Sequence, residues 1–125
     1  MGIAAFISTA LMVLVSIVTI PLVHGDQVQI EKAVAQCENR VCTFKVTLKH
    51  PDSGWKHYAD HWRILDSFNT EIARRTLYHP HVDEQPFTRS LENVEIPDNI
   101  SSIWVEAHDK VHGYSSDRFK LTIPE

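Results

Sequence analysis

Hydrophobic and polar residues alternate with a period of two along most of the chain after residue 26. The clearest case is the segment 41–50, where Phe44, Val46 and Leu48 are separated by polar residues. Such alternation is typical of a β-strand with one face buried and the other in solvent. Turn residues interrupt the pattern at short intervals, and no segment shows the 3.6-residue period of an amphipathic helix. The pattern therefore predicts an all-β domain.

About seven alternating segments follow one another, as expected for a small sandwich. They are residues 27–37, 41–50, 59–67, 71–78, 87–96, 102–109 and 118–123. We predict an antiparallel β-sandwich of the immunoglobulin or fibronectin type III class, in which Trp62 on the third strand is a core residue. The antibody-type disulfide between the second and sixth strands is missing, since neither cysteine lies in the sixth segment. Another antiparallel sandwich topology therefore stays open.

The N-terminal segment differs from the rest, because residues 3–23 contain no Asp, Glu, Lys or Arg. Such a run is an export signal or a membrane anchor rather than part of a soluble core. Gly25 before Asp26 suits signal-peptidase cleavage, whereas the length of the run and the weak basic character before it suit a retained anchor. We expect residues 1–25 to be a signal peptide or an uncleaved anchor. Residues 26–125 then form one periplasmic or secreted domain that meets a membrane only through the anchor.

The two cysteines, Cys37 and Cys42, are separated by four residues. Outside the cytoplasm the expected state of such a pair is a disulfide. A redox pair or a thiolate metal site is the alternative, but the C-x-x-C spacing of redox pairs is missing. The net charge of −4 and the lack of a basic stripe argue against a nucleic acid partner.

Seven of the eight histidines follow residue 26. They are His50, His57, His61, His79, His81, His108 and His112. In an antiparallel sandwich every second connection lies at the same end. All seven fall in or beside the second–third, fourth–fifth and sixth–seventh connections, so we predict that they gather at one end of the domain. The opposite end carries none.

Imidazole and carboxylate groups together form the ligand set of zinc, copper(II), nickel or iron(II). In His79-Pro80-His81 the proline favours extended backbone, which points both imidazoles to the same side. We predict that His79 and His81 bind a transition metal, copper or zinc, together with His108 or His112. Further ligands, or groups that orient the ligands, are predicted among His61, Asp83, Glu84 and Asp109.

The same residues allow two other interpretations. The histidines could hydrogen-bond the loops, or, with Tyr58 and Tyr114, form a metal-free surface that contacts another envelope protein or a ligand. We expect His50 to be packed at the rim, His57 to be solvated and Trp55 to cover the end of the core. Neither a nucleophile elbow nor a phosphate-binding glycine loop is present, which argues against a hydrolase or a phosphate site. A small metalloenzyme is a third hypothesis, but a domain of this size leaves little room for the substrate cleft that it needs, so we expect a binding protein rather than an enzyme.

Three strings of the sequence, LYHPHVDEQPFTRSLENVEIP, AHDKVHGY and GWKHYADHWRILD, resemble those of a group of small exported bacterial proteins. The resemblance extends from about Phe44 to the C-terminus. It implies a bacterial, periplasmic protein and makes glycosylation of the Asn99-Ile-Ser motif unexpected. It implies no activity, substrate or cofactor.

Overall fold

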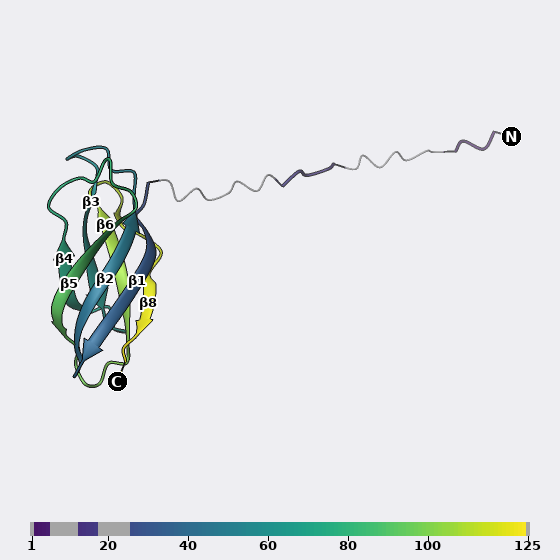
Figure 1. The fold of residues 1–125 in the computed structure, drawn as a ribbon. Helices are drawn as coiled ribbons and strands as arrows, with labels where there is room; N and C mark the ends of the chain where they lie inside the picture. Colours follow the sequence, from purple (N-terminus) through teal and green to yellow (C-terminus); the bar gives the residue numbers. More distant parts are fainter. Residues whose placement is uncertain (1, 6–12, 18–25, 125) are drawn as a thin grey trace.

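The computed structural model describes residues 2–5, 13–17 and 26–124. Residues 26–124 form strands arranged in two sheets (Figure 1). Most of the predicted signal peptide or anchor, residues 1–25, lies outside the described residues, as does Gly25 before the expected cleavage position. In the described ranges, no helix is long and apolar enough to cross a membrane.

Eight strands follow one another along the domain. They are β1 (Gln29–Glu38), β2 (Val41–Lys49), β3 (Ala59–Leu65), β4 (Glu71–Thr76), β5 (Phe87–Glu95), β6 (Ser102–Asp109), β7 (Gly113–Tyr114) and β8 (Phe119–Thr122). One sheet has the order β1-β2-β5, and the other has the order β4-β3-β6, with β7 and β8 both paired to β6. Every pairing is antiparallel, which confirms the predicted antiparallel β-sandwich. The finer assignment to the immunoglobulin or fibronectin type III class stays a prediction.

The short strand β7 lies in a stretch that the sequence predicted as a loop. Gly113, with a φ of 75°, allows the chain to reverse after β6, because glycine has no Cβ to clash in this region. The reversal pairs Gly113 with Asp109 and Tyr114 with His108. The strand β7 therefore places Tyr114 beside the last two residues of β6.

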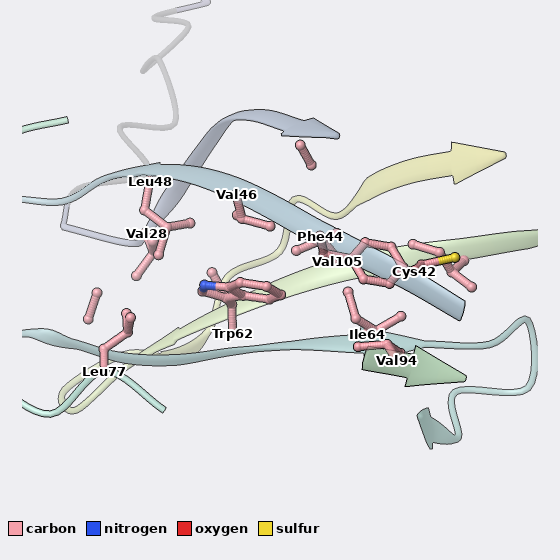
Figure 2. Packing of buried hydrophobic residues seen from close by; sticks show 14 of the residues in the cluster. Val28, Cys42, Phe44, Val46, Leu48, Trp62, Ile64, Leu77, Val94 and Val105 are labelled. Atoms are coloured by element: carbon pink, nitrogen blue, oxygen red, sulfur yellow. The ribbon is translucent and has the colours of Figure 1, made fainter. Parts of the chain in front are cut away.

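The core lies between the two sheets. Phe44, Val46 and Leu48 of β2 point toward Trp62 and Ile64 of β3, and all five are fully buried (Figure 2). Burial alternates along β2, as the hydrophobic pattern predicted. Burying one large apolar side chain stabilises a fold by roughly 1.5–3 kcal/mol, so this layer holds the two sheets together.

The β1–β2 hairpin closes one end of the sandwich. Asn39 and Arg40 have φ values of 51° and 65°, the two positive values that a two-residue type I′ turn requires. This register places Cys37 directly opposite Cys42, and the two form the predicted disulfide. The Arg40 guanidinium donates to the carbonyl oxygen of Pro97 at 2.6 Å, which fastens the hairpin to the β5–β6 connection.

Three connections gather at the opposite end of the sandwich, where β1 also begins (Figure 1). We call this region, residues 50–61, 77–86 and 108–118, the histidine end. All seven histidines of the domain lie in these connections or at the adjoining ends of β3 and β6. The prediction that the histidines gather at one end is confirmed.

Candidate metal centre

A first polar group lies inside the histidine end, around Asp109 at the end of β6. His50 follows β2 directly, and His57 lies in the β2–β3 connection. His57 Nε2 is 3.3 Å from Asp109 Oδ1, and His50 Nε2 is 4.0 Å from Asp109 Oδ2. One ligand-type atom of each residue lies within 4.8 Å of those of the other two. We call these three residues the inner group.

Asp52 fixes the orientation of His50. Its Oδ1 accepts a hydrogen bond from His50 Nδ1 at 2.5 Å and from the backbone N–H of Ala59 at 2.9 Å. Because His50 donates through Nδ1, the lone pair of its neutral form lies on Nε2, the nitrogen nearer Asp109. A carboxylate that holds the far nitrogen of an imidazole is the usual support behind a metal-binding histidine.

Three buried atoms of the inner group have no hydrogen-bond partner among the described residues. They are His50 Nε2, His57 Nε2 and Asp109 Oδ2. The carboxylates of Asp52 and Asp109 are fully buried, and neither pairs with a lysine or arginine within residues 26–124. Their described partners are backbone N–H groups and imidazoles, and a buried polar atom left without a partner costs roughly 1–3 kcal/mol. A cation bound between the three atoms would remove this cost.

Asp109 is well suited to bind a cation because it remains ionised. Burial raises its pKa, but the backbone N–H groups of His112 and Val111 lower it, and the imidazoles of His112 and His50 add to the lowering. The net result is a pKa below the usual value. These N–H groups donate to Oδ1 at 2.8 and 2.9 Å, so Oδ2 is left for another partner.

His112 lies beside the inner group at its solvent side. Its Nδ1 is 3.2 Å from Asp109 Oδ1, and its ring centroid is 5.1 Å from that of His57. The His112 side chain is 35% exposed, whereas that of Asp109 is fully buried. His112 is therefore the imidazole through which the inner group meets solvent.

A second polar group, which we call the outer group, consists of Asp60, His61, His108 and Tyr114 on the other face of the β3–β6 pair. His108 Nδ1 is 2.5 Å from Asp60 Oδ1, and His61 Nδ1 is 3.3 Å from the same oxygen. His61 Nε2 is 2.8 Å from the Tyr114 hydroxyl, and the two imidazole rings stack with centroids 4.4 Å apart. Ligand-type atoms of Asp60, His61 and His108 also lie within 4.8 Å of one another.

The outer group is the weaker metal candidate. Among the described residues, none of its buried side-chain atoms lacks a hydrogen-bond partner. Arg74 donates to the Tyr114 hydroxyl at 3.2 Å, and the Arg63 guanidinium lies 3.8 Å from the centre of the Tyr114 ring. Burial is the main reason that the pKa of His61 falls to about 4. The Asp60 carboxylate opposes this shift, whereas His108 and the two arginines lower the pKa further. The same positive charges disfavour a cation here.

The predicted pair His79 and His81 lies together, with ring centroids 4.5 Å apart. His81 is buried, and its Nε2 accepts a hydrogen bond from Arg89 at 2.9 Å, so this nitrogen already has a partner. Burial, and then Arg89, lowers the pKa of His81. Among the described residues, the two sets of converging ligand atoms include neither His79 nor His81. Metal binding by this pair stays a prediction.

The other predicted ligands have different surroundings. Asp109 belongs to the inner group, and His61 and His108 belong to the outer group. Asp83 and Glu84 are exposed. Glu84 pairs with Arg89 at 3.2 Å, and this hydrogen bond lowers the pKa of Glu84.

Two expectations for the β2–β3 connection are wrong. The His57 side chain is only 19% exposed, and Trp55 is 67% exposed instead of covering the core. The reason is a tight turn in which Gly54 pairs with His57 in an isolated β-bridge, so that Trp55 forms the outer tip and His57 points back. His50 is buried, as its position in phase with Leu48 predicted, but the hydrophobic pattern gave no sign that it would lie beside His57 and Asp109.

Comparison with known proteins gives one partial similarity. The chain is 41% identical over 75 residues to a Halomicrobium mukohataei protein named "Putative lipoprotein". The match covers 60% of this chain and 36% of that protein, so the chain spans well under two thirds of the relative's length. No family model and no solved structure matches the chain.

Proposed function

We propose that this protein is exported and binds one transition metal ion, zinc or copper(II), in the inner group. His50 Nε2, His57 Nε2 and Asp109 Oδ2 are the ligands. The observation that carries the proposal is that these three buried atoms lack partners while their residues converge. Two imidazoles and one carboxylate suit both metals.

The spacing of the ligand atoms supports this assignment. A tetrahedral site with bonds of about 2.0–2.1 Å places its ligands roughly 3.3 Å apart. His50 Nε2 is 4.0 Å from Asp109 Oδ2, and His57 Nε2 is 3.3 Å from Oδ1, the other oxygen of the same carboxylate. Ligand-type atoms of the three residues lie within 4.8 Å of one another, so the side chains have to move closer together when the ion binds.

Three protein ligands leave one coordination position for a further group. His112 is the fourth ligand in this proposal: its ring lies beside the inner group, and its Nδ1, now 3.2 Å from Asp109 Oδ1, has to turn toward the ion. Its partial exposure makes it the ligand that an incoming or leaving metal ion meets first. The centre is therefore largely buried, with His112 as its most exposed residue.

Export is supported by three independent features. Residues 3–23 carry no formal side-chain charge, which suits a signal or an anchor. Cys37 and Cys42 form a disulfide, a bond that persists outside the cytoplasm. The similarity to a protein named as a lipoprotein fits an envelope or secreted location.

The test is calorimetric titration of the metal-free protein with zinc and with copper(II) at neutral pH. We expect one equivalent to bind to the wild type and to a His79→Ala/His81→Ala variant, and none to bind tightly to His57→Ala. His57 is preferred to His50 for this test because it is partly exposed, so its removal disturbs the core less. Near-ultraviolet circular dichroism checks that each variant is folded.

The opposite outcomes are equally informative. If only the His79→Ala/His81→Ala variant fails to bind metal, the metal site lies in the histidine–proline–histidine loop and not in the inner group. Wild-type protein without micromolar affinity for either metal would refute the proposal.

A further inference from the structure

Large apolar side chains are exposed mainly at the histidine end. Four project from its connections: Trp55 (67% exposed), Tyr78 (75%), Val82 (54%) and Val111 (59%). Within residues 26–124, the only other large hydrophobic residues of this kind are Val41 and Phe68, both at the opposite end. An accumulation of exposed apolar groups at one end marks a surface that another phase or molecule covers.

The charges beside these apolar residues are balanced. Lys56 lies in the β2–β3 connection, Lys110 follows β6, and Asp83 and Glu84 lie in the β4–β5 connection; all four are exposed. The surface therefore has no strong field of one sign that would select a highly charged partner. An aromatic surface with mixed charges suits the boundary between a lipid bilayer and water, where Trp and Tyr bury the ring and keep the polar edge in water.

The apolar N-terminal run joins the domain at this same end, since β1 begins there (Figure 1). Val28 is buried at the start of the domain, and Val23 ends the run five residues earlier. Five residues span at most about 18 Å. A bilayer that held residues 3–23 would therefore lie within this distance of the histidine end.

The part of the run that the structure describes, residues 3–5 and 13–17, is not covered by the domain. Its described large residues are exposed: Ile3 (97%), Val13 (73%), Leu14 (82%), Val15 (77%) and Ile17 (84%). The 21 residues 3–23 meet the length of about 20 apolar residues that a membrane span requires.

We propose that residues 3–23 stay inserted in a bilayer and that the histidine end lies against its surface, with Trp55 and Tyr78 in the headgroup region. The short tether allows this end, and not the end with the disulfide, to face the lipid. The orientation does not depend on a bound metal, so it can be tested on metal-free protein.

The test measures the tryptophan fluorescence of full-length protein in phosphatidylcholine vesicles with EDTA. The vesicles contain lipids brominated near the headgroup end of their acyl chains, and bromine quenches the fluorescence of tryptophans that lie close to it. Trp55→Phe is compared with Trp104→Phe. Trp104 is a matched control because it pairs with Leu65 and Lys120 toward the opposite end of the sandwich. We expect brominated lipid to quench the wild type and Trp104→Phe, and the quenching to be lost in Trp55→Phe.

Other results overturn the proposal and indicate what replaces it. Equal quenching in Trp55→Phe and the wild type, or no quenching at all, would show that the histidine end does not touch lipid. Shielding of Trp55 from both the brominated lipid and aqueous iodide would indicate that a second copy or another protein covers this end. Protein recovered from expressing cells with a mass that begins at Asp26 would show that the anchor is removed.

Discussion

His108 and Asp109 are neighbours at the end of β6, yet their side chains belong to two separate polar groups. His108 Nδ1 lies 2.5 Å from Asp60 on the outer face of the sheet, while Asp109 is buried between the sheets beside His50 and His57. Successive residues of a strand point to opposite faces, so one strand end supplies both groups. A slip of one residue in the β3–β6 pairing would move each of the two side chains to the other face of the sheet and so destroy both polar groups.

Asp52→Asn should weaken metal binding without changing its stoichiometry. The carboxylate holds His50 Nδ1 at 2.5 Å and so presents Nε2 to the metal. Loss of such a supporting group typically raises the dissociation constant about 10–100-fold. Calorimetric titration measures the change, and Asp83→Asn, at an exposed carboxylate in the β4–β5 connection, is the control that should leave the affinity unaltered. An unchanged affinity in Asp52→Asn would mean that His50 is not a ligand.

Metal should stabilise the folded protein, because the ligands converge only when β2, β6 and the β2–β3 connection are folded. Free zinc at 100 times its dissociation constant adds about 2.7 kcal/mol to the free energy of unfolding. Urea titrations with zinc and with EDTA measure the difference. The gain should vanish in His57→Ala, and a gain that survives there would point to another binding site.

The buried His61 should make the metal-free protein less stable in acid. Its pKa is about 4 in the folded protein, against an ordinary value of 6.5, because burial disfavours the charged form. Between these values the unfolded chain binds more protons, so the free energy of unfolding rises with pH from about 4 to 6.5. The largest contribution is about 3 kcal/mol.

Urea titrations at several pH values in this window measure that slope. His61→Gln removes the titrating group and should flatten the curve. His81 contributes with the same sign, since its pKa is also lowered, so part of the slope should remain. The explanation fails if the wild type and His61→Gln lose stability equally as the pH falls.

Replacing both Cys37 and Cys42 by alanine should lower the free energy of unfolding by about 2 kcal/mol. The disulfide closes a short loop and restricts the unfolded chain. Urea titration compares the variant with the wild type, with and without dithiothreitol. The reductant should reproduce the loss in the wild type and leave the variant unaffected; a variant as stable as the wild type would show that the hairpin alone holds this end.

The sequence by itself determined the strands other than β7, the hairpin disulfide and the end of the sandwich that carries the histidines. These features depend on local rules: a period of two for half-buried strands, turn residues that reverse the chain, and the alternation of chain direction between strands. Because alternation places whole connections at one end or the other, His50 and His112 could be assigned to the same end although 61 residues lie between them.

Only the tertiary structure decided which histidines converge. His79 and His81 are close in sequence, but Arg89 reaches His81 Nε2 across the β4–β5 connection. His50 and His57 meet Asp109 because a tight turn points His57 back into the domain. Such contacts depend on positions within a few ångströms that separate strands and loops set jointly, whereas a hydrophobic pattern records only which face of its own strand a residue occupies.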